Sequence, residues 1–228
     1  MREPVTTMRV GLFGGTFNPI HLGHLRAALE VKEAFALHQC QLIPAAIPPH
    51  KDVDSVVEGQ DRLDMIKLAL SDQTDLSVCD AELKRSGPSY TIDTIRYFES
   101  ILPAPADMYL IMGQDAFLEI DTWKSYRKII GAIKIIVMMR PTFKNSSRDQ
   151  LKNSLKAMLD ACIDPGYRYC ETSSGYIHSR LQPVYIQPVT LLDISSSKIR
   201  QMIQAGVSVE YLLPPKVIQY IETKGLYR

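Results

Sequence analysis

Two histidines three residues apart follow a glycine pair near the start of the chain. The stretch from Gly14 to His24 reads GGTFNPIHLGH, and it stands between an apolar strand-like run and an amphipathic helix-like run. Residues at i and i+3 share a helix face, so His21 and His24 can both donate hydrogen bonds to one anion. The glycines let backbone N–H groups approach a ligand, and the helix start adds N–H donors that favour phosphate. The hydroxyl of Thr16 can join them.

Each part of this stretch has a structural explanation when it is taken alone. Gly14 and Gly15 could form only a turn, and a histidine near a helix start could be a cap or a core residue. The order strand, loop and helix favours a functional site, because ligands bind at the carboxyl ends of strands in an open α/β sheet. The stretch matches neither the GxGxxG nor the GxxxxGK[ST] phosphate-binding pattern.

Apolar and amphipathic runs alternate over the first two-thirds of the chain. The expected strands are Val10–Phe13, Gln41–Ala45, Leu76–Cys79, Met108–Met112 and Ile133–Met139, and the expected helices are 22–36, Gly59–Ser71 and Thr91–Leu102. Continuous apolar strands that alternate with helices predict an α/β fold with a doubly wound parallel sheet.

We expect one domain over residues 1–228, in which about 190–228 form a C-terminal helical part packed on the rest. Its helices are Ser195–Ala205 and Pro214–Lys224. Within 142–182 one helix is expected, Arg148–Cys162, and the remainder has no assignable pattern. In the first helix, the apolar side chains of Leu22, Leu25, Leu29 and Phe35 are expected to face the core, and Arg26, Glu30 and Glu33 to face water.

The composition is that of an ordinary globular protein. A formal net charge of +1 argues against duplex DNA as a partner, and no basic-aromatic cluster indicates RNA. Four cysteines without a CxxC pair argue against a zinc site or disulfides and favour the cytoplasm. No apolar run approaches the roughly 20 residues that a membrane helix needs, and the N-terminus is unlike a signal peptide. A homo-oligomer is compatible with the sequence, which carries no signal for or against one.

The segment from Thr16 to His24, with its HxGH ending, resembles the signature of the nucleotidylyltransferase superfamily. Most of the remaining chain is similar to the bacterial nicotinate-mononucleotide adenylyltransferases of that superfamily. The similar segments are PPHK at 48–51, RLDM at 62–65, ELKR at 82–85, SYT at 89–91, GQD at 113–115 with Trp123 behind it, RP at 140–141, ISSSKIR at 194–200, LLP at 212–214 and GLYR at 225–228. The resemblance implies a Rossmann-like nucleotidylyltransferase fold.

The resemblance also implies how the substrates are held. ATP would be bound by Gly14, Gly15, Thr16, Phe17, His21, His24, Ser195, Ser196, Ser197 and Arg200, with Thr16, His21, His24 and Arg200 as the catalytic groups. Mg²⁺ is expected to accompany the triphosphate, held by phosphate oxygens and water and without a protein ligand set. The three serines are a helix cap by default, and a cap and an anion site can coincide.

The mononucleotide would be bound by Lys51, Tyr90, Thr91, Asp115 and Trp123. Lys51 would hold its phosphate, Tyr90 and Thr91 would form the pocket for the nicotinate carboxylate, and Trp123 offers a π-face for the pyridine ring. Each has a plainer alternative: a surface lysine for Lys51, a core tryptophan for Trp123, and a helix N-cap in place of a ribose contact for Asp115.

The implied reaction is transfer of the adenylyl group of ATP to nicotinate mononucleotide, with release of pyrophosphate and no covalent enzyme intermediate, since motifs such as GxSxG are absent. The product, nicotinate adenine dinucleotide, makes this a step of NAD biosynthesis. Nicotinamide mononucleotide or phosphopantetheine are the alternative acceptors, and a non-catalytic nucleotide-binding regulator is the alternative of another class. Three positions depart from the family pattern: Asn18 stands where Asp is common, Ser197 where Thr is common, and Lys198 where an apolar residue is frequent.

Overall fold

The computed structural model describes residues 7–46, 56–139 and 148–228. The strands are β1 (Met8–Gly15), β2 (Gln39–Pro44), β3 (Ser77–Val78), β4 (Ala106–Gly113), β5 (Lys134–Met139), β6 (Arg168–Cys170), β7 (Gly175–Ile177) and β8 (Val184–Pro188). The α-helices are α1 (Leu22–Ala34), α2 (Gly59–Ala69), α3 (Thr91–Ile101), α4 (Gln114–Leu118), α5 (Tyr126–Ala132), α6 (Arg148–Met158), α7 (Ser196–Gln204) and α8 (Pro215–Lys224). A 3₁₀ helix, η2 (Ile120–Thr122), and a π-helical turn, η3 (Leu159–Ile163), complete them.

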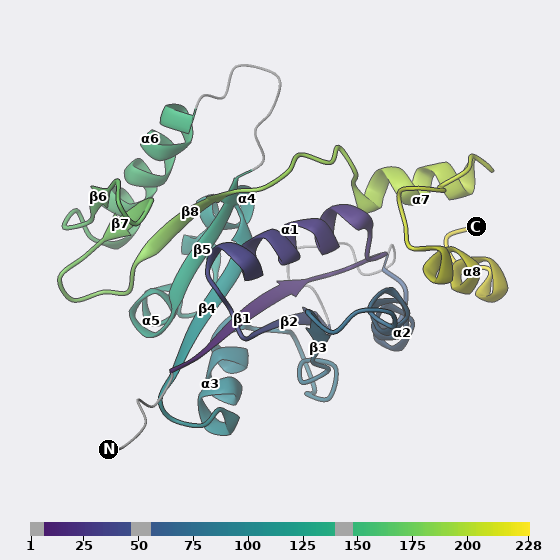
Figure 1. Ribbon diagram of the computed structural model, residues 1–228, viewed down its shortest axis with the longest axis horizontal. Helices are drawn as coiled ribbons and strands as arrows, with labels where there is room; N and C mark the ends of the chain where they lie inside the picture. The colour runs from purple at the N-terminus through teal and green to yellow at the C-terminus, as the bar shows by residue number, and fades with distance from the viewer. Residues whose placement is uncertain (1–6, 47–55, 140–147) are drawn as a thin grey trace.

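One twisted sheet runs through these elements in the order β3-β2-β1-β4-β5-β8-β7-β6 (Figure 1). The first six strands in this order are parallel, and β7 and β6 add an antiparallel edge. The chain moves outward from β1 to β3 and then returns to β4 on the other side of β1. The order therefore reverses between β1 and β4, where open α/β sheets form a ligand-binding crevice.

Helices cover both faces of the sheet, so the predicted doubly wound α/β fold is confirmed. Alternate residues of β5 show it directly: Ile135 and Val137 belong to a core with side chains from α3, α5 and α6, whereas Ile136 and Met138 belong to a second core with side chains from α1, α2, α7 and α8. Burial on both faces explains why the central strands are continuously apolar in the sequence.

The buried face of α1 differs from the predicted one. Its buried residues are Ala27, Ala28 and Val31, while the predicted Leu25, Leu29 and Phe35 pack against that core partly buried and Leu22 is only half-buried. Small side chains in the centre let the helix approach the sheet closely. Glu30, expected to face water, instead accepts hydrogen bonds from the backbone N–H (2.7 Å) and hydroxyl (2.5 Å) of Thr190.

The region that had no assignable pattern contains the antiparallel edge. The hairpin of β6 and β7 has strands of three residues, too short to show a period of two, and β8 follows it. The predicted helix 148–162 is present, but its last turn is π-helical. The three short helical segments between residues 114 and 132 were not predicted either.

Helix α8 packs beside α2, and both C-terminal helices lie on the side of the molecule away from β6 and β7 (Figure 1). The Tyr220 hydroxyl of α8 donates to Asp61 of α2 at 2.8 Å. Lys216 donates to both carboxylate oxygens of Asp72 at 2.8 Å. These contacts fix where α8 and the segment that follows it lie relative to the carboxyl edge of the sheet.

Arg62 of α2 is 1% exposed and bonds the loops at that edge to one another. Its guanidinium donates to the carbonyl oxygens of Thr16 (Nη1, 2.8 Å), Ala46 (Nη2, 3.1 Å) and Val57 (Nε, 3.1 Å). Thr16 belongs to the loop after β1, and Ala46 and Val57 belong to the two described ends of the connection between β2 and α2. One side chain thus satisfies three loop carbonyls that no sheet or helix bonds.

We predict that Arg62→Met lowers the free energy of unfolding by about 3 kcal/mol, because three carbonyls lose their donor. Urea unfolding at neutral pH measures the change. Arg96→Met is the matched control, since Arg96 forms an exposed i,i+3 pair with Asp93 and should cost less than about 0.5 kcal/mol. Equal losses for the two variants would contradict the role given to Arg62.

Candidate active site

The glycine pair belongs to the end of β1 and not to a separate turn. Gly14 pairs with Ile43 and Gly15 with Pro44 in the parallel ladder, so the strand is longer than predicted. A Cβ on Gly15 would stand 2.8 Å from the Phe17 ring, which explains the glycine there. Phe17 has a positive φ of 49°, so the chain turns sharply and carries residues 18–20 toward α1.

His21 and His24 form a reciprocal cap at the start of α1. The His24 backbone N–H donates to His21 Nδ1, and the His21 backbone N–H donates to His24 Nδ1, both at 3.3 Å. The rings stack with centroids 3.6 Å apart. A neutral imidazole that accepts through Nδ1 carries its proton on Nε2. The cap therefore sets both rings to be Nε2–H donors, the form that a phosphate requires.

Two neighbours fix this stack. A Cβ on Gly23 would lie 3.1 Å from His21 Nδ1, so glycine leaves room for the His21 ring. On the other side the Phe17 ring meets His24 edge-on at a centroid distance of 5.1 Å. Phe17 is 2% exposed, so its side chain supports the histidines from the core. Any contact of Phe17 with ATP would have to come from its backbone.

The loop between β1 and α1 is held by the C-terminal part of the chain. Arg200 Nη1 donates to the carbonyl of Asn18 and Ser196 Oγ to that of Pro19, both at 2.9 Å. The Tyr227 hydroxyl donates to Asn18 Oδ1 at 2.8 Å, and Val57 N–H donates to the same oxygen at 3.3 Å. Asn18 is 3% exposed. Its side chain is thus a buried acceptor, a role that does not need a carboxylate.

The three serines at the start of α7 make different contacts. Ser195 is the N-cap and accepts the backbone N–H of Lys198 at 3.2 Å, as the default interpretation expected. Ser197 Oγ lies 3.5 Å from Arg200 Nη2. Because Ser196 contacts Pro19, the N-terminus of α7 lies beside the loop that leads into α1. Two helix N-termini with partial positive charge therefore flank residues 18–20, which favours an anion there.

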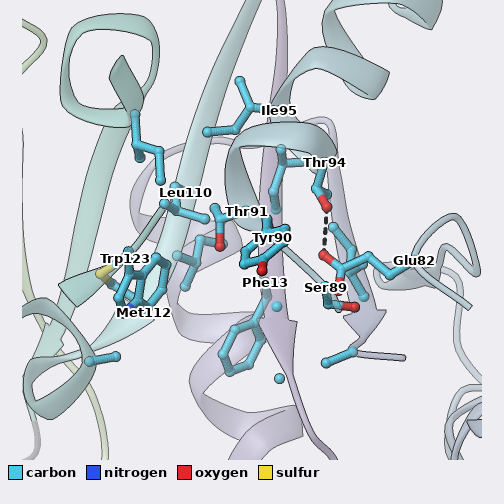
Figure 2. Close-up of a pocket in the computed structure, with 18 of the residues that line it drawn as sticks. Phe13, Glu82, Ser89, Tyr90, Thr91, Thr94, Ile95, Leu110, Met112 and Trp123 are labelled. Atoms are coloured by element: carbon cyan, nitrogen blue, oxygen red, sulfur yellow. Dashed lines mark hydrogen bonds between the residues drawn. The ribbon is translucent and has the colours of Figure 1, made fainter. Parts of the chain in front are cut away.

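A cavity of about 500 Å³ opens at the carboxyl ends of β1 and β4, where the strand order reverses. Its walls come from both strands and from the segments that follow β3 and β4 (Figure 2). The lining residues that bear on its chemistry are Gly14, Gly15, Thr16, Glu82, Ser89, Tyr90, Thr91, Thr94, Trp123 and Lys124. The predicted phosphate loop and three of the predicted mononucleotide residues thus meet in one cavity.

Aromatic side chains give this cavity its flat surfaces. Trp123 is half-buried after η2, and Tyr90 stands at the N-terminus of α3 (Figure 2). Tyr90 is the α3 N-cap residue and makes no side-chain capping bond, so the first helical N–H groups, beginning with Thr91, are not capped by a side chain. A helix start of this kind next to a π-face suits a planar ring that carries a carboxylate.

The buried carboxylate of Glu82 closes another side of the cavity. The Thr94 hydroxyl donates to Glu82 Oε1 at 2.6 Å (Figure 2). Arg85 Nη2 donates to Thr94 Oγ1 at 2.7 Å. Arg85 Nη2 is also 3.8 Å from Glu82 Oε1. The negative charge of Glu82 is therefore balanced within the protein. Nearby, Ser89 Oγ accepts the backbone N–H of Ala46 at 2.8 Å and ties the wall to the loop after β2.

Two of the residues predicted to bind the mononucleotide, Lys51 and Asp115, are not among those seen to line the cavity. Lys51 lies outside the described residues, as do the similar segments at 48–51 and 140–141. Asp115 is exposed in the first turn of α4 and is not among the residues that line the cavity. The N-cap of α4 is Gly113, so the capping alternative for Asp115 is wrong. Its contact with a ribose stays a prediction, as do the ligand contacts of the histidines and of Arg200.

Four residues around the site were not predicted: Glu82, Lys124, Arg62 and Tyr227. Glu82, Arg62 and Tyr227 lie in segments that carry the family resemblance, but no periodicity reveals that their side chains turn toward the site. Lys124 directly follows Trp123 and lines the same cavity. Its position next to the single tryptophan is the signal that could have found it.

In the part of the chain that the structure describes, no three His, Cys, Asp or Glu side chains gather as a metal-ligand set. A divalent cation that entered with a triphosphate would take its ligands from phosphate oxygens and water, the usual preference of Mg²⁺. Among these described residues, no helix has the length and apolar character needed to cross a bilayer.

The fold and the segment from Gly14 to His24 point to a class of protein. The model of the cytidylyltransferase-like family matches residues 12–202, and the chain belongs to that family. A curated relative from Pseudomonas syringae pv. tomato, named probable nicotinate-nucleotide adenylyltransferase, is 40% identical over 220 residues, which cover 96% of this chain and 94% of the relative. A relative of the same name from Desulfatibacillum aliphaticivorans is 37% identical and covers 96% of this chain and 100% of the relative.

A solved structure shares the fold across nearly the whole chain. It is the Plasmodium falciparum nicotinic acid mononucleotide adenylyltransferase complexed with NaAD, with a TM-score of 0.71 and 17% identity. The match covers 96% of this chain and 97% of that one. The same elements thus form the same arrangement at low sequence identity.

We predict that Tyr227→Phe lowers the free energy of unfolding at pH 7 by about 1 kcal/mol, because Asn18 Oδ1 loses a buried donor. Burial raises the pKa of Tyr227 well above its ordinary value near 10. The tyrosine therefore stabilises the fold fully below about pH 10, and this contribution falls as the unfolded chain ionises above that pH. The stability gap between wild type and variant should narrow between about pH 10 and 11, as thermal melts would show. A gap that widened there would contradict a buried neutral donor.

Proposed function

We propose that this protein transfers the adenylyl group of ATP to nicotinate mononucleotide and releases pyrophosphate, forming nicotinate adenine dinucleotide for NAD biosynthesis. The proposal rests mainly on one observation: the glycine–histidine segment expected to hold the ATP phosphates adjoins the cavity expected to hold the nicotinate ring. The capped pair His21 and His24 belongs to the same strand–loop–helix segment as Gly14, Gly15 and Thr16, which line the cavity that contains Trp123. The names of the curated relatives support the same reaction.

The nicotinate end of the acceptor fits the cavity. Its pyridine ring would stack on Trp123, and its carboxylate would lie near the start of α3, where Tyr90 and Thr91 stand. The cavity volume of about 500 Å³ is within the range of small-molecule sites. Lys51 would hold the 5′-phosphate and Asp115 the ribose.

The triphosphate end fits the starts of α1 and α7. His21, His24 and Thr16 would hold the ATP phosphates, together with Arg200 and the N-terminus of α7. Arg200 already donates to Asn18 through Nη1, so Nη2 is the nitrogen to turn toward the leaving pyrophosphate. Mg²⁺, when bound with ATP, would neutralise phosphate charge and orient the triphosphate.

The chemistry is a direct displacement. An oxygen of the mononucleotide 5′-phosphate forms a bond to the α-phosphorus of ATP, the bond from that phosphorus to the α–β bridging oxygen breaks, and pyrophosphate leaves with the electron pair. Such transfers depend on positioning and on balancing negative charge, and they need no enzyme nucleophile. The Nε2–H donors supplied by the histidine cap are suited to that charge.

The cytoplasm is the compartment that we infer for this reaction. The four cysteines, Cys40, Cys79, Cys162 and Cys170, are free thiols, as a reducing compartment favours. Burial raises the pKa of Cys40 to about 12, so this thiol stays protonated and inert at neutral pH.

Pyrophosphate release tests the proposal directly. The purified protein is given Mg²⁺-ATP with nicotinate mononucleotide, nicotinamide mononucleotide or phosphopantetheine as the acceptor. We expect the highest kcat/KM with nicotinate mononucleotide and the deamido dinucleotide as product. Preference for another acceptor would overturn the substrate assignment alone. A folded protein that binds ATP but turns over none of them would instead be a nucleotide-binding regulator.

We predict that His24→Ala lowers kcat about 10²- to 10³-fold, because the transition state loses one preorganised donor. His24 also caps α1, so His24→Asn serves as a second variant. Its amide oxygen can replace Nδ1 as the cap acceptor, but it places no donor at the Nε2 position. If His24→Asn melts like wild type and keeps near-normal kcat, His24 has no part in the chemistry.

A further inference from the structure

We propose that Lys124 determines the preference for a carboxylate over a carboxamide on the pyridine ring of the acceptor. This inference rests on the proposed function and deepens it, since it names the group that distinguishes nicotinate from nicotinamide. Lys124 follows Trp123 directly and lines the same cavity. Its Nζ lies 4.0 Å from the centroid of the Tyr90 ring.

The charges around the cavity leave Lys124 as its cationic group. Among the described residues that line the cavity, the charged side chains are Glu82 and Lys124. Glu82 is balanced by Arg85, which lies 3.8 Å away and shares the Thr94 hydroxyl. Among these described lining residues, the ammonium of Lys124 is therefore the charge that is left for an acceptor.

The position of Lys124 matches the position that the ring substituent must take. Tyr90 and Thr91, at the start of α3, stand beside Trp123 in the cavity wall (Figure 2). A pyridine stacked on Trp123 would therefore have an edge toward them. The cation–π contact holds Nζ above Tyr90, at that same wall. A ring carboxylate would gain a charge pair with Nζ, whereas a neutral carboxamide would gain none.

The other contact of Lys124 is weak. Its Nζ is 3.9 Å from Asp93 Oδ2, near the limit of an ion pair, and Asp93 also pairs with Arg96 at 3.3 Å. The Lys124 side chain is 52% exposed. Nζ can therefore turn to an entering carboxylate at little cost. Solvent screening also limits the effect to a modest factor.

Kinetics of Lys124→Met with both mononucleotides test the proposal. We expect KM for nicotinate mononucleotide to rise about five- to tenfold, with kcat and the KM for ATP within about twofold of wild type. The KM for nicotinamide mononucleotide should not change. Lys124→Glu should raise the first KM further and again leave the second unchanged.

Lys128→Met is the matched control. Lys128 is an exposed lysine on α5, four residues after Lys124 in the chain, and it is not among the cavity-lining residues. Its variant should behave like wild type with both acceptors. An equal rise of both KM values in Lys124→Met, or no rise in either, would overturn the proposal.

Binding gives a readout that does not depend on turnover. Trp123 is the single tryptophan, so its fluorescence reports a ring that stacks in the cavity. Titration with each mononucleotide should show a Kd ratio that favours nicotinate in wild type and shrinks five- to tenfold in Lys124→Met. If wild type binds with this preference but transfers no adenylyl group, the proposed function fails and the role of Lys124 stands. An unchanged Kd ratio in the variant overturns the role of Lys124 alone.

Discussion

The buried guanidinium of Arg62 is the interaction on which the site depends. Parallel strands end in loops whose carbonyls have no ladder partner, and two such loops, after β1 and after β2, meet at the carboxyl edge of this sheet. A buried carbonyl without a donor costs free energy comparable to a lost hydrogen bond. The planar fork of one arginine bonds the carbonyls of Thr16, Ala46 and Val57 together. A single side chain therefore holds these three points of the two loops in place.

The rigidity of this frame gives the histidines their direction. Each ring of the pair uses Nδ1 to accept a backbone N–H of the other residue, so neither ring can rotate without breaking the cap of α1. The space above Gly23 and the edge of Phe17 fix the stack from both sides. A site that works by positioning benefits from side chains that are ordered before the ligand binds. The entropy of ordering them is then lost during folding and does not weaken binding.

The fold was predictable because its signals are local. Central strands such as 133–139 are apolar without interruption, and helices such as Gly59–Ala69 are long enough to show their period. The hairpin of β6 and β7 was not predictable, because strands of three residues are too short to show an alternation of apolar and polar side chains.

The same distinction holds in the site. The segment from Gly14 to His24 is contiguous, so its strand, loop and helix could be read directly from the sequence. The partnership of Glu82 with Thr94, or of Asn18 with Tyr227, exists only after folding brings distant residues together. Tyr90, Thr91 and Trp123 were identified through the family resemblance, and the structure adds Lys124 beside them.

The supports of the loop between β1 and α1 also impose an order on its assembly. Pro19 accepts a hydrogen bond from Ser196, which lies 177 positions further along the chain. Asn18 accepts hydrogen bonds from Arg200 and Tyr227, which lie 182 and 209 positions further along. During synthesis from the N-terminus, the loop is made first and receives these partners last. Contacts of such long sequence separation form late, because their chain-closure entropy is compensated only after the intervening sheet exists. The loop between β1 and α1 therefore lacks these three hydrogen bonds until the C-terminal part of the chain has folded against it.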